Sequence, residues 1–336
     1  MNTSPLGAAR RQPVATSAAG WVVHTGELSL PYVVRPTVEV ELARWARDQV
    51  STVDGWLHTH GAVLFRGFGI GLDGFAAVAA ALAGPPLPYR ERSTPRTQLA
   101  DGVYTSTEYP ADQSIPLHNE NAYQRCFPAR LVFGCVTPPA AGGATPLADC
   151  RRVLARIDPA TVEAFRRRQV RYVRHFHEGM GLSWREAFGE SDPQRVDEYC
   201  AAHDIAPHWR DGHLRTEQLR PAIARHPVTG EQTWFNHVNL FHPSALAEPV
   251  HAALVAQYGA DRLPTDVSYG DGSAIDIGAL ARIRAAYAAE TVAVPWQAGD
   301  VLLVDNVLVA HGRQSYEGPR RIVVSMGGML CHEDTP

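Results

Sequence analysis

Hydrophobic and polar positions alternate in recognisable patterns along the first third of this chain. Residues 61–70, GAVLFRGFGI, form an apolar run that ends in glycines, which is typical of a buried strand. Hydrophobic residues recur at helical spacing over 38–60 and again over 72–83, where Gly84 and two prolines stop the pattern. Residues 87–115 have no long period and many turn formers, so we expect a loop there.

The rest of the chain mixes strand and helix patterns. Asp158 followed by Pro159 predicts a capped helix start, and Thr229-Gly230 lies between two strand-like halves, as in a hairpin. Other segments follow the same rules. Strands are expected at 129–139, 170–176, 291–296, 301–306 and 320–330, and helices at 248–259 and 276–290.

This order of elements predicts a fold class. Many short strands of uneven spacing, with helices at the flanks and strands at both ends, indicate a mainly β protein with flanking helices (α+β). A jelly-roll core with helical cover fits best. We expect residues 1–20, which are small and polar, to be disordered, and 21–336 to form a single domain with a helical insertion around 150–290.

Composition excludes several classes of function. The chain has 336 residues, 45% of them hydrophobic and 20% charged, with a net charge of −4 and no basic run able to follow a nucleic acid. It contains no apolar stretch near the ~18–20 residues of a membrane span. Its five cysteines show no CxxC spacing, so we expect them to be reduced in a cytoplasmic protein.

The segment PLHNENAY, residues 116–123, is the first candidate for chemistry. On an extended strand, His118 and Glu120 project to the same face and Asn119 to the other. His311 follows a buried strand and precedes a glycine, which makes it the best third ligand. Two histidines and one carboxylate form the facial triad of non-haem Fe(II) oxygenases. Zinc is the weaker alternative, because its catalytic sites usually take two ligands from one helix.

Other histidines offer competing pairs. His175 and His177 also stand at i and i+2, but no carboxylate occupies a matching place, so we assign them to packing or to the surface. His237 and His242 remain open between a structural role and contact with a substrate.

An iron centre of this type uses a 2-oxoacid, whose far carboxylate calls for a guanidinium. Arg321 lies ten residues after His311 on an apolar strand, and we expect it to face the site. Arg320 falls on the opposite face by alternation and is expected to face solvent. Arg313 is a further cofactor candidate, with orientation of its own loop as the alternative.

Taken in order, PLHNENAY, GGATPLAD, WQAGDVLLVDN, AHGR and RRI resemble the TauD/TfdA family of Fe(II)/2-oxoglutarate dioxygenases over roughly residues 60–332. The resemblance implies a double-stranded β-helix (jelly-roll, cupin-like) core, with Fe(II), 2-oxoglutarate and O2 as cofactor and cosubstrates. It implies that His118, Glu120 and His311 hold iron and that Thr145 and Arg321 bind 2-oxoglutarate. The details look closest to the SyrP-like branch.

The resemblance also implies a reaction. It favours hydroxylation of an unactivated C–H bond in an amino acid or a derivative, free or tethered to a carrier protein, in an antibiotic or other natural-product pathway. Desaturation or cyclisation by the same chemistry is the alternative, and a non-catalytic cupin-like binding protein is the alternative of another class. Glu120 stands where related halogenases have Gly or Ala, and Ser325 stands where taurine dioxygenase has a second Arg. Candidate substrate contacts are Asn121, Tyr123, Asn236, His237, Asn239 and Ser325.

Overall fold

The computed structural model describes residues 21–24 and 30–336, and the head expected to be disordered, 1–20, lies outside them. Within these residues the largest sheet has eight strands and is antiparallel except for the pair β2–β3. In spatial order its strands are β1 (Trp21–His24), β2 (Tyr32–Pro36), β3 (Ala62–Phe65), β16 (Val301–Asp305), β7 (Cys126–Thr137), β19 (Arg321–Cys331), β5 (Val103–Thr105) and β4 (Gln98–Ala100).

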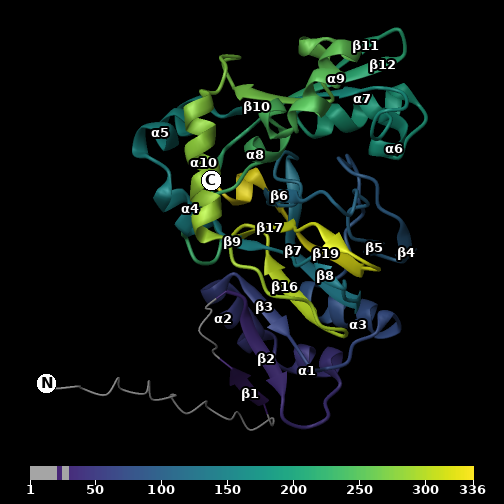
Figure 1. Ribbon diagram of the computed structural model, residues 1–336, viewed down its shortest axis with the longest axis vertical. Helices are drawn as coiled ribbons and strands as arrows, with labels where there is room; N and C mark the ends of the chain where they lie inside the picture. The colour runs from purple at the N-terminus through teal and green to yellow at the C-terminus, as the bar shows by residue number, and fades with distance from the viewer. Residues whose placement is uncertain (1–20, 25–29) are drawn as a thin grey trace, which may run out of the picture.

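A smaller sheet packs against the inner face of the large one, and the two form the jelly-roll core (Figure 1). Its strands are β6 (Ile115–His118), β17 (Val309–Arg313) and β9 (Leu147–Asp149). Buried side chains of both sheets meet between them, among them Phe133, Leu147, Leu302, Val309 and Val324. A short pair, β8 (Ala141–Gly142) with β18 (Tyr316–Glu317), lies beside this core.

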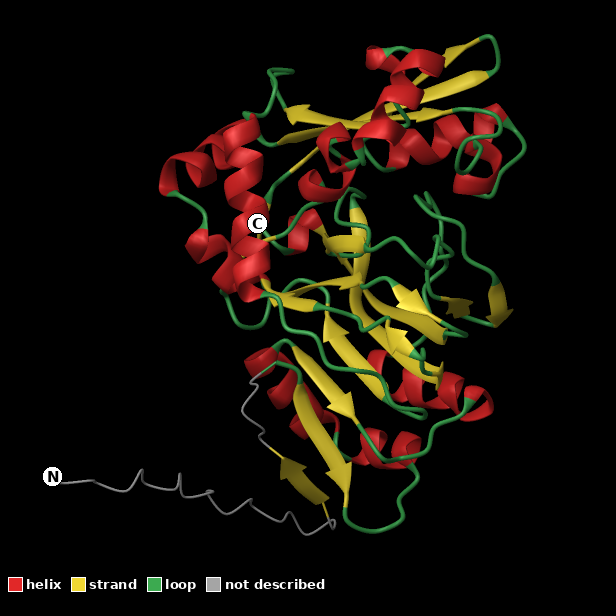
Figure 2. Ribbon diagram, viewed as in Figure 1, coloured by secondary structure: helices red, strands yellow, loops and turns green. Residues whose placement is uncertain are grey.

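Three N-terminal helices cover the outer face of the large sheet (Figure 2): α1 (Leu42–Asp48), α2 (Val50–His60) and α3 (Leu72–Ala83). Phe75 and Leu82 of α3 pack with Val132 and Val323 of the sheet. The central strands are therefore buried on both faces, which makes their sequences apolar throughout. As expected, α3 stops at Gly84, which takes a positive φ of 80°.

Residues 150–290 form the upper part of the molecule (Figure 1). They include helices and also a four-stranded sheet and a hairpin, with alternating burial along the strand His213–Arg220. The helices are α4 (Cys150–Arg156), α5 (Pro159–Arg168), α6 (Trp184–Phe188), α7 (Pro193–Ala202), α8 (Val238–Phe241), α9 (Glu248–Tyr258) and α10 (Ile277–Glu290), with short 3-10 turns at Pro243–Ala245, Ala260–Arg262 and His332–Asp334. The strands are β11 (Ala206–Arg210), β12 (His213–Arg220), β10 (Val170–Phe176) and β15 (Thr265–Tyr269), with the hairpin β13 (Ile223–Arg225) and β14 (Gln232–Trp234).

Three local expectations differ from the structure. The segment 87–115, expected to be a loop, contains the short strands β5 and β4, which end the large sheet. The segment 291–296 is not a strand and makes a single bridge, between Val292 and Leu147. Cys126 and Cys331, expected to be reduced, are cross-strand partners of β7 and β19 and form a disulfide. They lie 205 residues apart, so no local spacing could have indicated the pair. In the part of the chain that is described, no helix is long and apolar enough to cross a membrane.

Candidate metal centre

Three candidate ligands converge where the small sheet ends. His118, the last residue of β6, is the cross-strand partner of His311 in β17, and the centroids of their rings lie 4.5 Å apart. Glu120 follows in the turn after β6, so the strand expected to carry both His118 and Glu120 stops at the histidine. One ligand atom from each of the three side chains lies within 4.8 Å of the others.

Local contacts set the protonation of His118. Its Nδ1 lies 2.8 Å from the carbonyl oxygen of Pro116, which requires the proton on Nδ1 and leaves the Nε2 lone pair free. Burial, and then the neighbouring His311 and His237, lower the pKa of His118 to about 3. The imidazole is therefore neutral near pH 7, as a metal ligand must be.

Asn306 fixes the backbone of Glu120. Its side-chain oxygen accepts from the Glu120 N–H at 2.7 Å, and its amide donates to the Glu120 carbonyl at 2.9 Å and to that of Pro128 at 2.8 Å. Asn306 is fully buried directly after β16, so the large sheet positions the carboxylate.

Arg96 fixes the charge of Glu120. Its Nη2 donates to both carboxylate oxygens, at 3.0 and 2.9 Å, and both residues are buried. Burial alone would raise the pKa of Glu120, but Arg96 and then His311 outweigh it and hold that pKa well below its usual range. The carboxylate is therefore ionised, so the triad supplies one anion and, from His118, a neutral imidazole.

A cavity opens beside these ligands, with about 390 Å³ of empty space that is partly open to solvent. We call it the triad cavity, and its walls include Arg96, His118, Phe133, Thr145, His311, Arg313, Arg320 and Ile322. Three guanidinium groups thus reach one space, and no Asp or Glu is among the residues that line it. Such a surface suits an anionic ligand.

The expectation that Arg321 faces this cavity is wrong, because its side chain is exposed. Arg320 lines the cavity instead, on the same face of the chain as Ile322 and Val324. Alternation correctly separated the two arginines but did not tell which face turns inward, because the α1–α3 layer buries the opposite face as well.

Arg320 has the features of an anion binder. Its guanidinium donates to the carbonyl of Gly143 at 3.0 Å and to the hydroxyl of Ser106 at 3.3 Å, and pairs with no carboxylate of the described residues. Burial, and then the charge of Arg313, lower its pKa to about 10. An anion placed in the cavity would raise this pKa again, because its charge stabilises the guanidinium.

Thr145 and Arg313 also line the cavity. Thr145 Oγ1 accepts from the Trp296 indole at 3.2 Å, so its own hydrogen remains available to donate. The Arg313 guanidinium is occupied differently, donating to the carbonyls of Tyr109, Pro110 and Gln113 at 2.5–2.8 Å. This arrangement matches the loop-orienting alternative for Arg313 better than direct contact with a cofactor.

The predicted substrate contacts do not line the triad cavity. Tyr123 is fully buried and packs between His237 and Phe241. His237 lies behind His118, with ring centroids 5.5 Å apart, and its Nε2 is 2.6 Å from the Asn119 carbonyl. His237 therefore packs directly against the proposed ligand His118, and Tyr123 packs against His237.

The other four residues make their contacts outside the triad cavity. Asn236 accepts from the N–H of Val238, the first residue of α8, at 3.0 Å, and Asn239 accepts from Arg284 at 3.0 Å. Asn121 lines a separate cavity together with Cys126 and Phe127. Ser325 shares a strand face with Val323 and so turns toward the helices. These positions correct the expectation, which rested only on nearness in sequence to the ligands.

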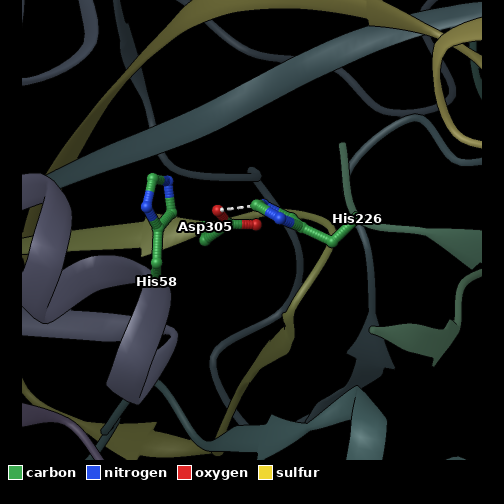
Figure 3. A group of neighbouring side chains, drawn as sticks. All are labelled: His58, His226 and Asp305. Atoms are coloured by element: carbon green, nitrogen blue, oxygen red, sulfur yellow. Dashed lines mark hydrogen bonds and ion pairs between the residues drawn. The ribbon is translucent and has the colours of Figure 1, made fainter. Parts of the chain in front are cut away.

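A second group of possible ligands, His58, His226 and Asp305, is shown in Figure 3. The Nδ1 of His226 accepts from the N–H groups of Val228 and Thr229 at 3.3 and 3.0 Å, so its proton lies on Nε2. That nitrogen donates to Asp305 at 3.0 Å. A metal ion would have to displace this proton from an imidazole that already uses its other lone pair, so the group is a structural hydrogen-bond cluster.

Sequence reasoning missed three supporting residues: Arg96, Trp296 and Asn306. Asn306 follows the buried strand 301–305 directly, and a polar residue at such a strand end is a usable signal. Arg96 lies in an aperiodic loop, where nothing local distinguishes it from Arg90 or Arg92. The donor set nevertheless fits Fe(II), because two imidazoles and a carboxylate on one side leave the other positions open.

Comparison with known proteins agrees with this chemistry. The family model described as taurine catabolism dioxygenase TauD, TfdA family, matches residues 28–326. Dapdiamide synthesis protein DdaC of Enterobacter agglomerans is 45% identical over 276 residues, 82% of this chain and 84% of that protein. A clavaminate synthase-like protein of Arabidopsis thaliana is 32% identical over 297 residues, 83% of this chain and 85% of that protein.

Solved structures share the fold at low identity. PvcB from Pseudomonas aeruginosa is 15% identical, with a TM-score of 0.57 over 96% of this chain and 98% of its own. AAD-2, solved with Mn(II) and N-oxalylglycine, is 13% identical, with a TM-score of 0.54 over 93% of this chain and 99% of its own. The chain therefore belongs to the TauD/TfdA family and is a non-haem iron dioxygenase that uses Fe(II), 2-oxoglutarate and O2 on a jelly-roll core.

Proposed function

We propose that His118, Glu120 and His311 hold Fe(II), and that Arg320 with Thr145 binds the far carboxylate of 2-oxoglutarate. The observation that carries this proposal is the convergence of the three ligand atoms within 4.8 Å of one another. The cavity beside them is lined by Arg320, which pairs with no carboxylate of the described residues. Arg321, exposed at the start of β19, has no part in the site.

The chain's own residues prepare the site before any ligand arrives. Pro116 and Asn306 fix the orientation of His118 and Glu120 through their hydrogen bonds. Trp296 holds the Thr145 hydroxyl so that its hydrogen can donate to a carboxylate. Phe133 and Ile322 form an apolar wall that limits water. Bound iron, with 2-oxoglutarate and O2, supplies the oxidising power that no side chain has.

We propose that the reaction is hydroxylation of an unactivated C–H bond in an amino acid or amino-acid-derived small molecule in a natural-product pathway. The carboxylate ligand Glu120 favours oxygen insertion over halogenation, which uses a centre without that ligand. The 45% identity to a protein named for dapdiamide synthesis supports a biosynthetic role. Desaturation or cyclisation remains the alternative outcome of the same chemistry, and the substrate is either free or tethered to a carrier protein.

Anaerobic reconstitution tests the centre. Adding Fe(II) and 2-oxoglutarate to wild-type protein should give a visible charge-transfer band, and His118→Ala should abolish it. His58→Ala, from the structural cluster, is the matched control and should keep the band. A band of wild-type strength in His118→Ala would remove that residue from the ligand set.

Product analysis tests the reaction. The purified enzyme with Fe(II), 2-oxoglutarate and O2 is offered amino acids, free and as carrier-protein thioesters, and succinate formation is measured. Hydroxylation adds one oxygen atom to the product, whereas desaturation removes two hydrogens. Substrate-dependent succinate with a dehydrogenated product would replace the hydroxylase assignment by the desaturase alternative.

A further inference from the structure

Arg96 has donors that the metal centre leaves unused. It is 9% exposed and lines the triad cavity, yet only its Nη2 is engaged, by the two oxygens of Glu120. The Nε and Nη1 groups are buried and donate to nothing within the described part of the chain. Buried donors without acceptors are costly, and a guanidinium N–H gives a strong charge-assisted hydrogen bond to a carboxylate.

The loop that carries Arg96 is firmly held. Glu91, in the same loop, is buried with a positive φ of 51°, and its carboxylate accepts from Gln218 at 3.1 Å and Tyr199 at 3.4 Å. Its backbone carbonyl accepts from Tyr123 and Gln124. The Arg96 guanidinium also lies over the Tyr89 ring, 5.0 Å from the centroid. Arg96 is therefore presented by a rigid support, which favours ligand binding.

The net charge of the site is a second, independent reason to expect an anionic ligand near Arg96. The cavity is lined by Arg96, Arg313 and Arg320, and Glu120 supplies one neighbouring negative charge. A bound Fe(II) adds two positive charges, and 2-oxoglutarate brings two negative ones. These groups sum to a net charge of about +2, which is unfavourable in a partly buried site until another anion enters.

We infer that Arg96 is the anchor for a carboxylate of the substrate, bound through its free Nη1. This assignment rests on the proposed function, because the inferred site adjoins the proposed iron and 2-oxoglutarate positions. It makes the substrate an anion with a free carboxylate, which distinguishes a free acid from a carrier thioester whose carboxyl group is blocked.

In the test, Mn(II) replaces Fe(II), N-oxalylglycine replaces 2-oxoglutarate, and propionate replaces the substrate carboxylate. The full-length protein is loaded with Mn(II) and N-oxalylglycine, and binding of both is verified first by electron paramagnetic resonance. Propionate is then titrated, and the relaxation that Mn(II) induces in its methyl protons is measured by NMR and normalised to bound Mn(II). Only a probe that binds near the metal is relaxed, and propionamide is the neutral isostere.

Wild-type protein should relax propionate and leave propionamide nearly unaffected. Arg96→Gln should weaken propionate binding about tenfold or more, as expected for the loss of charge-assisted hydrogen bonds. Arg92→Gln removes the same charge from the same loop outside the cavity and should stay within about twofold. Arg96→Lys, which keeps the charge but lacks the Nη1 donor, should fall between wild type and Arg96→Gln.

Equal relaxation of propionate and propionamide by wild-type protein would overturn the inference, as would unchanged propionate binding in Arg96→Gln. The comparison of propionate with propionamide on wild-type protein still tests whether a carboxylate binds near the metal if Arg96→Gln fails to hold Mn(II). Failure of the wild-type protein to bind Mn(II) and N-oxalylglycine would instead overturn the proposed function, so the two failures are distinguishable.

Discussion

His118 and His311 are direct cross-strand partners, although 193 positions separate them in the chain. Their pairing in the small sheet brings the ring centroids to 4.5 Å and leaves only Glu120 to be positioned by other means. The geometry of the centre therefore depends on the packing of β17 against β6, and the predictions below begin there.

Gly312→Ala should disturb the pairing of β6 and β17. A Cβ at this position would lie 2.6 Å from the Ile115 carbonyl oxygen, which is backbone of β6 and cannot rotate away. We expect the free energy of unfolding to fall by about 1–3 kcal/mol and Mn(II) to bind more weakly. Urea unfolding and a calorimetric Mn(II) titration measure the two effects.

Gly55→Ala is the control for Gly312→Ala. Gly55 lies in helix α2, and nothing lies within 4 Å of the position its Cβ would take. It should stabilise the protein by about 0.5–1 kcal/mol and leave Mn(II) binding unchanged. Unchanged Mn(II) affinity in Gly312→Ala as well would show that the strand pairing tolerates the extra methyl group.

Arg320→Gln should raise the dissociation constant for 2-oxoglutarate about 10- to 100-fold, because a charge-assisted fork to a carboxylate contributes about 1.5–3 kcal/mol. Arg321→Gln is its neighbour and control, and should stay within about twofold. Titration of the charge-transfer band with 2-oxoglutarate measures both. If Arg321→Gln has the larger effect, the face of β19 assigned to the cavity is incorrect.

Asn306→Leu should weaken metal binding although Asn306 is not one of the proposed ligands. It removes three hydrogen bonds to the backbone of Glu120 and Pro128 and leaves those buried groups unsatisfied. We expect a loss of about 2–4 kcal/mol in the free energy of unfolding, with weaker Mn(II) binding. Asn239→Leu, which loses one half-buried bond to Arg284, should cost less than about 1 kcal/mol and spare the metal. Equal losses in both variants would contradict a positioning role for Asn306.

Acid should destabilise the metal-free protein partly through His332. Burial, and then the charge of Arg220, lower the pKa of His332 to about 4, whereas in the unfolded chain it titrates near 6.5. Between these two values the unfolded state binds the extra proton and the folded state does not. The free energy of unfolding therefore falls as pH drops from about 6.5 toward 4, by roughly 1.4 kcal/mol per pH unit from this group.

His332→Gln should remove that contribution, since glutamine does not titrate and can still donate to the Ala122 carbonyl. Urea unfolding between pH 7 and 5 in the presence of a chelator would compare the slopes. The variant should have the shallower dependence on pH, and parallel curves would show that His332 does not carry the effect.

The sequence was sufficient to predict the jelly-roll core and the convergence of the three proposed ligands, because strand ends and flanking glycines are local signals. It could not predict which face of a strand turns toward the cavity where both faces are apolar. Both faces of β19 are apolar, since one meets the small sheet and the other meets helices α1–α3, so alternation could not decide correctly whether Arg320 or Arg321 turns toward the cavity. Arg96 and the disulfide partner of Cys126 depend on long-range packing, which no short window of sequence contains.

Arg313 has a consequence for how this enzyme can change. It stands on the strand of His311 and holds the segment 109–113 through three main-chain carbonyl oxygens, and its guanidinium also lies 5.8 Å from the centroid of the Tyr109 ring. Apart from Tyr109, the side chains of this segment can therefore vary while its backbone stays in place. Evolution or directed libraries can change these residues, which lie between the cavity residues Thr107 and Ile115, without loosening the proposed iron site.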